Sequence, residues 1–160
     1  NDGANLLRGN PGADTLLGAA GFDTLHGGMG LDRLQGGAGA DRLDGREGGD
    51  TLTGGAGADR FVFTSAPGAG NVDRITDFNA AADTIVLEDA VFAAIGAPGA
   101  LAAPAFHAGA AAHDADDRII HDASTGSLFY DSDGNGAGAS VLFARIPIGL
   151  ELGAADFVIA

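Results

Sequence analysis

The sequence contains no cysteine and no lysine, and each absence narrows what the protein can be. Without cysteine, the chain has neither a disulfide framework nor a thiolate metal site. With 22 Asp and Glu residues and only 8 basic ones, its formal net charge is −14. An acidic balance of this size argues against nucleic acid and anionic membranes as partners, and it favours bound cations.

Long apolar runs and catalytic motifs are also missing. No stretch approaches the roughly 18 apolar residues of a membrane span, and no basic and apolar leader opens the chain, so we expect no membrane insertion. The sequence lacks H-E-x-x-H, G-x-S-x-G and a Walker loop. The pairs His113–Asp114 and His121–Asp122 would point to opposite strand faces. We therefore expect no enzyme activity here; any activity would lie in an upstream domain.

A nine-residue repeat extends from Gly9 to Phe61. Its units read GNPGADTLL, GAAGFDTLH, GGMGLDRLQ, GGAGADRLD, GREGGDTLT and GGAGADRFV. Each has the form G-x-x-G-x-D-x-Φ-x, where Φ is apolar, and Gly3, Asn5 and Leu7 fit an earlier partial unit. Six units in phase are not accidental.

Each unit predicts a glycine turn followed by a short strand. Two units would close one coil of a flattened parallel spiral, with the apolar residues pointing inward and their Thr or Arg neighbours pointing outward. The expected inner columns are Leu7, Leu25, Leu43 and Phe61 on one sheet, and Leu16, Leu34 and Leu52 on the other.

The same geometry stacks acidic residues along both edges of the spiral. One row holds Asn5, Asp23, Asp41 and Asp59, and the other holds Asp14, Asp32 and Asp50. Carboxylates about 4.8 Å apart repel by roughly 3–4 kcal/mol per neighbour at an effective dielectric of about 20. A Ca²⁺ ion, which takes six to eight oxygen ligands, would remove this repulsion. Counting the gaps between neighbours predicts about five ions.

These units resemble the nonapeptide repeats of RTX proteins, whose calcium-binding parallel β-roll occurs in type I secreted bacterial toxins, proteases, lipases and adhesins. The resemblance implies that the sixth-position carboxylates bind calcium: Asp14, Asp23, Asp32, Asp41, Asp50 and Asp59. It also implies that turn carbonyls complete the sites: Gly28, Gly30, Gly37, Gly39, Gly55 and Gly57. The second position departs from glycine at Asn10, Ala19 and Arg46, and Asn5 replaces Asp.

Beyond the repeats, NVDRITDFNAAADTIVLEDA resembles the segment that caps the roll in RTX proteins. Asp73 either binds a further calcium ion there or simply caps a turn. One or two helical turns fit Ala90 to Ile95. A hairpin is predicted from Arg118 to Asp131, and a third strand from Ser140 to Arg145.

The sequence DSDGNG fits the opening of an EF-hand loop. Its ligands would be Asp131, Asp133 and Asn135. Leu142, however, stands where such a loop needs a bidentate Glu. These residues therefore either hold one more calcium ion or form an acidic turn.

Together these features predict an all-β protein, with a calcium-binding roll over residues 1–63. Residues 64–160 would form a mainly antiparallel β cap with at most a short helix. The ending AADFVIA is typical of the uncleaved signal of type I substrates. The predicted function is a calcium-binding module that folds extracellularly after passing the type I secretion apparatus.

An alternative function is a polysaccharide-binding or adhesive module of a secreted protein. The outward-pointing arginines Arg33, Arg42 and Arg60 would contact a polyuronate, and Arg42 and Arg60 would stack on one sheet. Such arginines equally well balance neighbouring aspartates.

Overall fold

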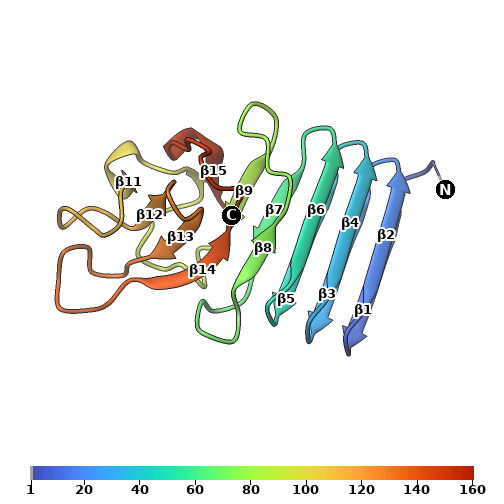
Figure 1. The fold of residues 1–160 in the computed structure, drawn as a ribbon, viewed down its shortest axis with the longest axis horizontal. Coiled ribbons are helices and arrows are strands. Elements are labelled where there is room, and N and C mark those ends of the chain that lie inside the picture. Colours follow the sequence, from blue (N-terminus) through green and yellow to red (C-terminus); the bar gives the residue numbers. More distant parts are fainter. Residues whose placement is uncertain (1) are drawn as a thin grey trace.

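The repeats form a two-sheet parallel roll in the computed structural model, which describes residues 2–160. Successive strands alternate between the sheets and each pairs with the strand two along the chain (Figure 1). The strands are β1 (Leu6–Pro11), β2 (Thr15–Ala20), β3 (Thr24–Met29), β4 (Arg33–Ala38), β5 (Arg42–Glu47), β6 (Thr51–Ala56) and β7 (Arg60–Phe63). The predicted β-roll is therefore confirmed.

The register places both apolar columns as predicted. In one sheet Leu7 pairs with Leu25, then come Leu43 and Phe61. In the other, Leu16, Leu34 and Leu52 lie in register. All of these side chains except that of Leu7 are buried. The same register recurs at every coil. Each strand therefore contributes one inward-pointing apolar residue, mostly leucine, and these residues stack along the interior of the roll.

The strands β1 to β6 are longer than predicted. Each has six residues and continues through the first glycine into the next unit. Where the second position is not glycine, the backbone adopts a left-handed conformation, with φ of 70° at Asn10, 82° at Ala19 and 72° at Arg46. L-residues other than Asn and Asp rarely adopt this conformation. The roll therefore imposes its turn geometry even where the sequence departs from glycine.

Replacing Ala19 with Gly is expected to raise the free energy of unfolding by up to about 1 kcal/mol. The left-handed conformation costs alanine about 1–2 kcal/mol, which exceeds the entropic cost of glycine, about 0.5–1 kcal/mol. Ala20→Gly is the matched control, because the φ of Ala20 is not positive, and it should destabilise instead. Urea unfolding in saturating calcium would measure both, and the same sign for both variants would contradict the expectation.

The cap continues both sheets of the roll. Its strands are β8 (Asp73–Ile75), β9 (Thr84–Leu87), β10 (Gly99–Ala100), β11 (Phe106–Ala108), β12 (Ile119–Asp122), β13 (Ser127–Tyr130), β14 (Val141–Arg145) and β15 (Phe157–Ile159). One sheet has the order β1-β3-β5-β7-β9-β15-β10 and the other β11-β12-β13-β14-β8-β6-β4-β2. Both sheets thus run without interruption past residue 63.

The cap differs from the prediction in two respects. It is mixed rather than mainly antiparallel: β12, β13 and β14 pair antiparallel as predicted, but β8, β9, β14 and β15 extend the parallel sheets. Ala90 to Ile95 forms hydrogen-bonded turns instead of a helix, and the helices of residues 2–160 are short 3₁₀ turns, η1 (Ala103–Ala105) and η2 (Ala154–Asp156). The ending AADFVIA, described from the sequence only as a typical secretion signal, contains the strand β15 between β9 and β10.

Aromatic side chains join the cap to the end of the roll. Phe63 of the last repeat strand packs edge-on against Phe143, with ring centroids 5.1 Å apart, and Phe92 contacts both Phe143 and Tyr130. These rings continue the leucine columns in one apolar cluster. The cap therefore covers the apolar end of the roll that the last repeat would otherwise expose to water.

Candidate metal centre

Backbone amides hold the acidic residues in two rows inside the turns. The amide of Asp23 donates to Asp41 Oδ1 at 2.8 Å, and the amide of Asp41 donates to Asp59 Oδ1 at 2.9 Å. Asp14, Asp32 and Asp50 are joined in the same way, at 2.8 Å per bond. Asn5 begins the first row by donating to Asp23 Oδ1. Both predicted rows are therefore present.

The second carboxylate oxygen of each repeat aspartate is buried and has no hydrogen-bond partner. These atoms are the Oδ2 atoms of Asp14, Asp23, Asp32, Asp41, Asp50 and Asp59. An unpartnered buried carboxylate oxygen is costly unless a cation or a donor reaches it. Six such atoms in two ordered rows are therefore suited to bind cations.

The first glycine of each unit makes room for this oxygen. A Cβ added at Gly18 would lie 2.5 Å from the Gly36 carbonyl oxygen and 2.6 Å from Asp23 Oδ2. At Gly27 the corresponding distances are 2.7 Å to Gly45 O and 2.5 Å to Asp32 Oδ2. A free carboxylate oxygen and a carbonyl oxygen of the following coil thus face the same small space. The sequence motif did not single out these first-glycine carbonyls.

The predicted turn carbonyls are directed along the roll toward the next coil. A Cβ at Gly55 would overlap the carbonyl oxygen of Gly37, and one at Gly57 would overlap that of Gly39. The Gly30 carbonyl meets Gly48 in the same manner. Ligation by the carbonyls stays a prediction for all six glycines: Gly28, Gly30, Gly37, Gly39, Gly55 and Gly57. The turns therefore present oxygen atoms between coils, which are the ligands that Ca²⁺ prefers.

Cap residues extend both rows beyond the repeats. The amide of Asp50 donates to Asp73 Oδ1 at 2.9 Å, and the amide of Asp59 donates to Asp83 Oδ1 at 3.0 Å. Asp77 accepts the amides of Gly54 and Gly55. The prediction included Asp73 and missed Asp83 as a row member. The sequence does contain a signal for Asp83, because D-T-I-V, which begins at this residue, repeats the D-x-Φ-x end of a unit.

Burial raises the pKa of the carboxyl groups nearest the cap. It raises the pKa of Asp50 and of Asp59 to about 6 and that of Asp73 to about 8. Amide hydrogen bonds oppose the shift, and neighbouring carboxylates add to it less than burial does. For these three carboxyl groups, the cost of charge without metal therefore comes first from loss of solvation and less from the carboxylate repulsion that the sequence suggested.

We expect the calcium-free chain to lose stability as the pH rises from 5 to 8. An unfolded Asp has a pKa of about 3.9, so between that value and the raised folded values only the folded chain still binds these protons. Stability then falls with increasing pH. Circular dichroism in metal-free buffer at several pH values would measure the folded fraction. A folded fraction that is constant or rises toward pH 8 would disprove the expectation.

The DSDGNG segment forms a loop whose carboxylates bond to its own backbone. Asp131 Oδ1 accepts the Asp133 amide at 3.1 Å, and Asp133 Oδ2 accepts the Gly138 amide at 2.9 Å. The amide of Asn135 donates to the Asp114 carbonyl. These bonds are typical of an acidic turn. Calcium ligation by Asp131, Asp133 and Asn135 stays a prediction.

Of the two His–Asp pairs in the cap, one differs from its sequence-based description. His113 and Asp114 lie in a loop rather than a strand, and His113 Nδ1 is 3.3 Å from Asp114 Oδ2, so the opposite-faces argument was wrong for this pair. His121 lies in β12 and is buried, with neither ring nitrogen hydrogen-bonded. Burial lowers the pKa of His121, which keeps the ring neutral near pH 7.

The fold and the turns define a calcium-binding repeat module, and comparison with known proteins agrees. The family model of the RTX calcium-binding nonapeptide repeat, in four copies, matches residues 1–25 and 26–61. The first 61 residues are therefore RTX-type repeats. Among solved structures, the R3 subunit of AlgE6, a mannuronan C5-epimerase of Azotobacter vinelandii, aligns with 99% of this chain and 80% of its own, at 23% identity and a TM-score of 0.35.

No curated protein sequence matches the chain. Within residues 2–160, no helix is long and apolar enough to cross a membrane.

Proposed function

We propose that calcium ions lie between successive coils of the roll and that the chain folds when they bind. The observation that carries this proposal is the set of six buried Oδ2 atoms without a partner. In this proposal Oδ2 of each repeat aspartate and the turn carbonyls supply the ligands. The donor set is all oxygen and anionic, which suits Ca²⁺ and does not suit softer metals.

The number of ions is bounded by the gaps between row members. With Asp73 and Asp83 included, one row has three gaps and the other has four. The sequence alone suggested about five ions, with one or two more beyond the roll. In this proposal the two additional gaps, at the junction of the roll and the cap, take two further ions.

Coupling of folding to calcium suits a protein that is exported unfolded. The buried carboxylates disfavour the folded state without metal, and binding to the folded state alone stabilises it by mass action. In a calcium-poor cytoplasm the chain would stay unfolded and pass the type I secretion apparatus; extracellular calcium would then fold it. The RTX-type repeats support this part of the proposal. The division into a roll over 1–63 and a secretion-signal cap over 64–160 belongs to the same proposal.

A calcium titration followed by circular dichroism tests the coupling. We expect little β signal in excess chelator and a cooperative rise as calcium is added, with magnesium at the same concentration giving a much weaker response because it demands a rigid octahedral shell. Hydrogen exchange of the repeat amides would follow the same midpoint. A fully formed β signal in chelator would exclude the proposal.

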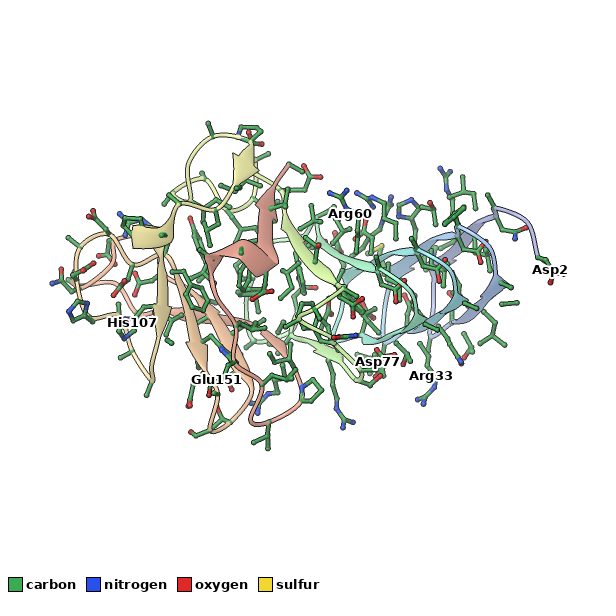
Figure 2. All side chains as sticks on the ribbon, turned by 90° about the horizontal axis from the view of Figure 1, so that it is seen from above. Asp2, Arg33, Arg60, Asp77, His107 and Glu151 are labelled. Carbon is green, nitrogen blue, oxygen red and sulfur yellow. The ribbon has the colours of Figure 1, made fainter. Side chains whose placement is uncertain are left out.

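A second candidate function is binding of an acidic polysaccharide on the outer face of one sheet. Arg42 and Arg60 are in register on neighbouring strands, as predicted, and Arg33 lies on the other sheet. Within residues 2–160 no carboxylate lies within ion-pairing distance of these three guanidinium groups. Figure 2 shows Arg33 and Arg60 reaching away from the ribbon on opposite sides. This favours an external anion over balancing of neighbouring aspartates.

Calorimetry with polyuronate oligomers in saturating calcium tests the second candidate. We expect the double variant Arg42→Gln with Arg60→Gln to lose the binding heat, whereas Arg33→Gln should retain most of it. Absence of heat from the unmodified chain at high oligomer concentration removes this function and leaves the calcium proposal untouched.

A further inference from the structure

The end of the molecule opposite the first repeat carries two histidines and an aspartate that face one another. His107 lies in the edge strand β11, and His113 and Asp117 lie in the loop that leads to β12. One ligand atom from each of the three lies within 4.8 Å of both others. Figure 2 shows His107 at the far end of the cap, with Asp2 at the opposite end. The cluster is therefore separate from the aspartate rows.

The distances in this cluster are too long for hydrogen bonds and close to those between ligands of one ion. Asp117 Oδ2 is 3.8 Å from His107 Nδ1 and 3.7 Å from His113 Nδ1. Two ligands of a tetrahedral zinc ion, each about 2.0–2.1 Å from the metal, are about 3.3 Å apart. A movement of about 0.4 Å would therefore bring each imidazole nitrogen to this separation from the carboxylate oxygen.

The surrounding backbone fixes both the carboxylate and the first imidazole. The amides of His113 and Asp114 donate to Asp117 Oδ2 at 2.6 and 3.0 Å, and this carboxylate is buried. Burial works against ionisation, but these bonds together with the neighbouring imidazoles His107 and His113 lower the pKa of Asp117, so the group is anionic as a ligand must be. His107 Nε2 lies against Gly109, where a Cβ would come within 2.5 Å, so Nδ1 is the nitrogen left for a metal.

The two rings are stacked in parallel, with centroids 5.2 Å apart and an angle of 10° between the planes. Two protonated imidazoles at this distance would repel each other, whereas two neutral ones can share a cation. The side chain of His113 is 69% exposed, which leaves an entry path and an open coordination position for water.

We propose that His107, His113 and Asp117 form a site for a borderline-soft divalent cation, with Zn²⁺ as the best match. Imidazole nitrogens select zinc, copper or nickel over calcium, so this site and the aspartate rows take different metals. Bound metal would pin the loop to the edge strand β11. Zinc would then stabilise the cap independently of calcium.

Calorimetric titration of the full chain, without an affinity tag and in saturating calcium, tests this site with Zn²⁺ as the probe. We expect one zinc ion per chain. His113→Gln, at an exposed position that should not disturb folding, is expected to weaken zinc binding at least about tenfold because it removes one of three ligands. The matched control is His26→Gln: His26 Nδ1 lies 3.3 Å from Asp44 Oδ2 but has no second histidine beside it.

Two outcomes would overturn the site. One is the absence of saturable zinc binding while calcium saturates the roll; the other is equal zinc affinity for the unmodified chain and His113→Gln. Proton NMR gives an independent readout, since zinc should shift the ring signals of His107 and His113 and leave those of His26 in place. Ring shifts confined to His26 would equally reject the proposal.

Discussion

Gly48→Ala is expected to destabilise the calcium-bound roll by several kcal/mol. The φ of Gly48 is 130°, and a Cβ there would overlap the carbonyl oxygen of Gly30 in the preceding coil. The backbone conformation alone costs a non-glycine residue about 1–3 kcal/mol. Separating the two coils to relieve the overlap costs about 1–3 kcal/mol more. The sum is a large part of the stability of a small domain.

Gly68→Ala is the matched control for this variant, because no atom lies within 4 Å of its added Cβ and its φ is not positive. Urea unfolding at saturating calcium measures both. Gly68→Ala should stay within about 0.5 kcal/mol of the unmodified chain. If the two variants unfold at the same urea concentration, the close stacking of Gly48 on Gly30 does not exist in solution.

Asp41→Asn is expected to weaken calcium binding and at the same time to stabilise the calcium-free chain. In the proposed arrangement Asp41 Oδ2 is a calcium ligand, so we expect the calcium midpoint to rise at least about tenfold and fewer ions to bind. Burial raises the pKa of Asp41, which means that its charge is costly when no metal is present. Asparagine removes that charge but keeps an oxygen to accept the Asp23 amide.

Asp41→Ala separates the two roles of this side chain. It removes the charge and also the acceptor, and the buried Asp23 amide left without a partner costs about 1–3 kcal/mol whether or not calcium is present. Asp116→Asn, an exposed position in the cap, makes the same charge change away from the rows. Calcium titrations followed by circular dichroism measure all three, and the β signal in chelator reports the calcium-free stability. An unchanged calcium midpoint for Asp41→Asn would remove Asp41 from the ligands.

The repeat region was predictable because one period sets both its geometry and its chemistry. The nine-residue spacing determines which leucines stack and which aspartates share an edge, and the observed register agrees at Leu25, Leu43 and Asp41. The period does not determine how deeply each carboxylate is buried. The sequence therefore suggested repulsion between carboxylates, whereas loss of solvation is the larger cause at Asp50 and Asp73.

The cap was less predictable because its contacts are not periodic. Asp83 follows Asp59 by 24 residues rather than 18, so counting from the repeats misses it. The cluster of His107, His113 and Asp117 forms only because a loop folds back over an edge strand, which residue spacing does not indicate. The terminal β15 is held inside its sheet by β10, a two-residue strand within a segment whose sequence has no strand signature.

The amide bonds along each acidic row all run in one direction, which gives the roll a polarity. In each row, the aspartate amide of one coil donates to a carboxylate oxygen of the following coil. The last amides of the two rows donate to Asp73 and Asp83. A designer could thus lengthen the solenoid at its amino side by adding whole coils. Truncation at its carboxyl side, in contrast, would remove the carboxylate oxygens of Asp73 and Asp83, and two other acceptors would have to replace them.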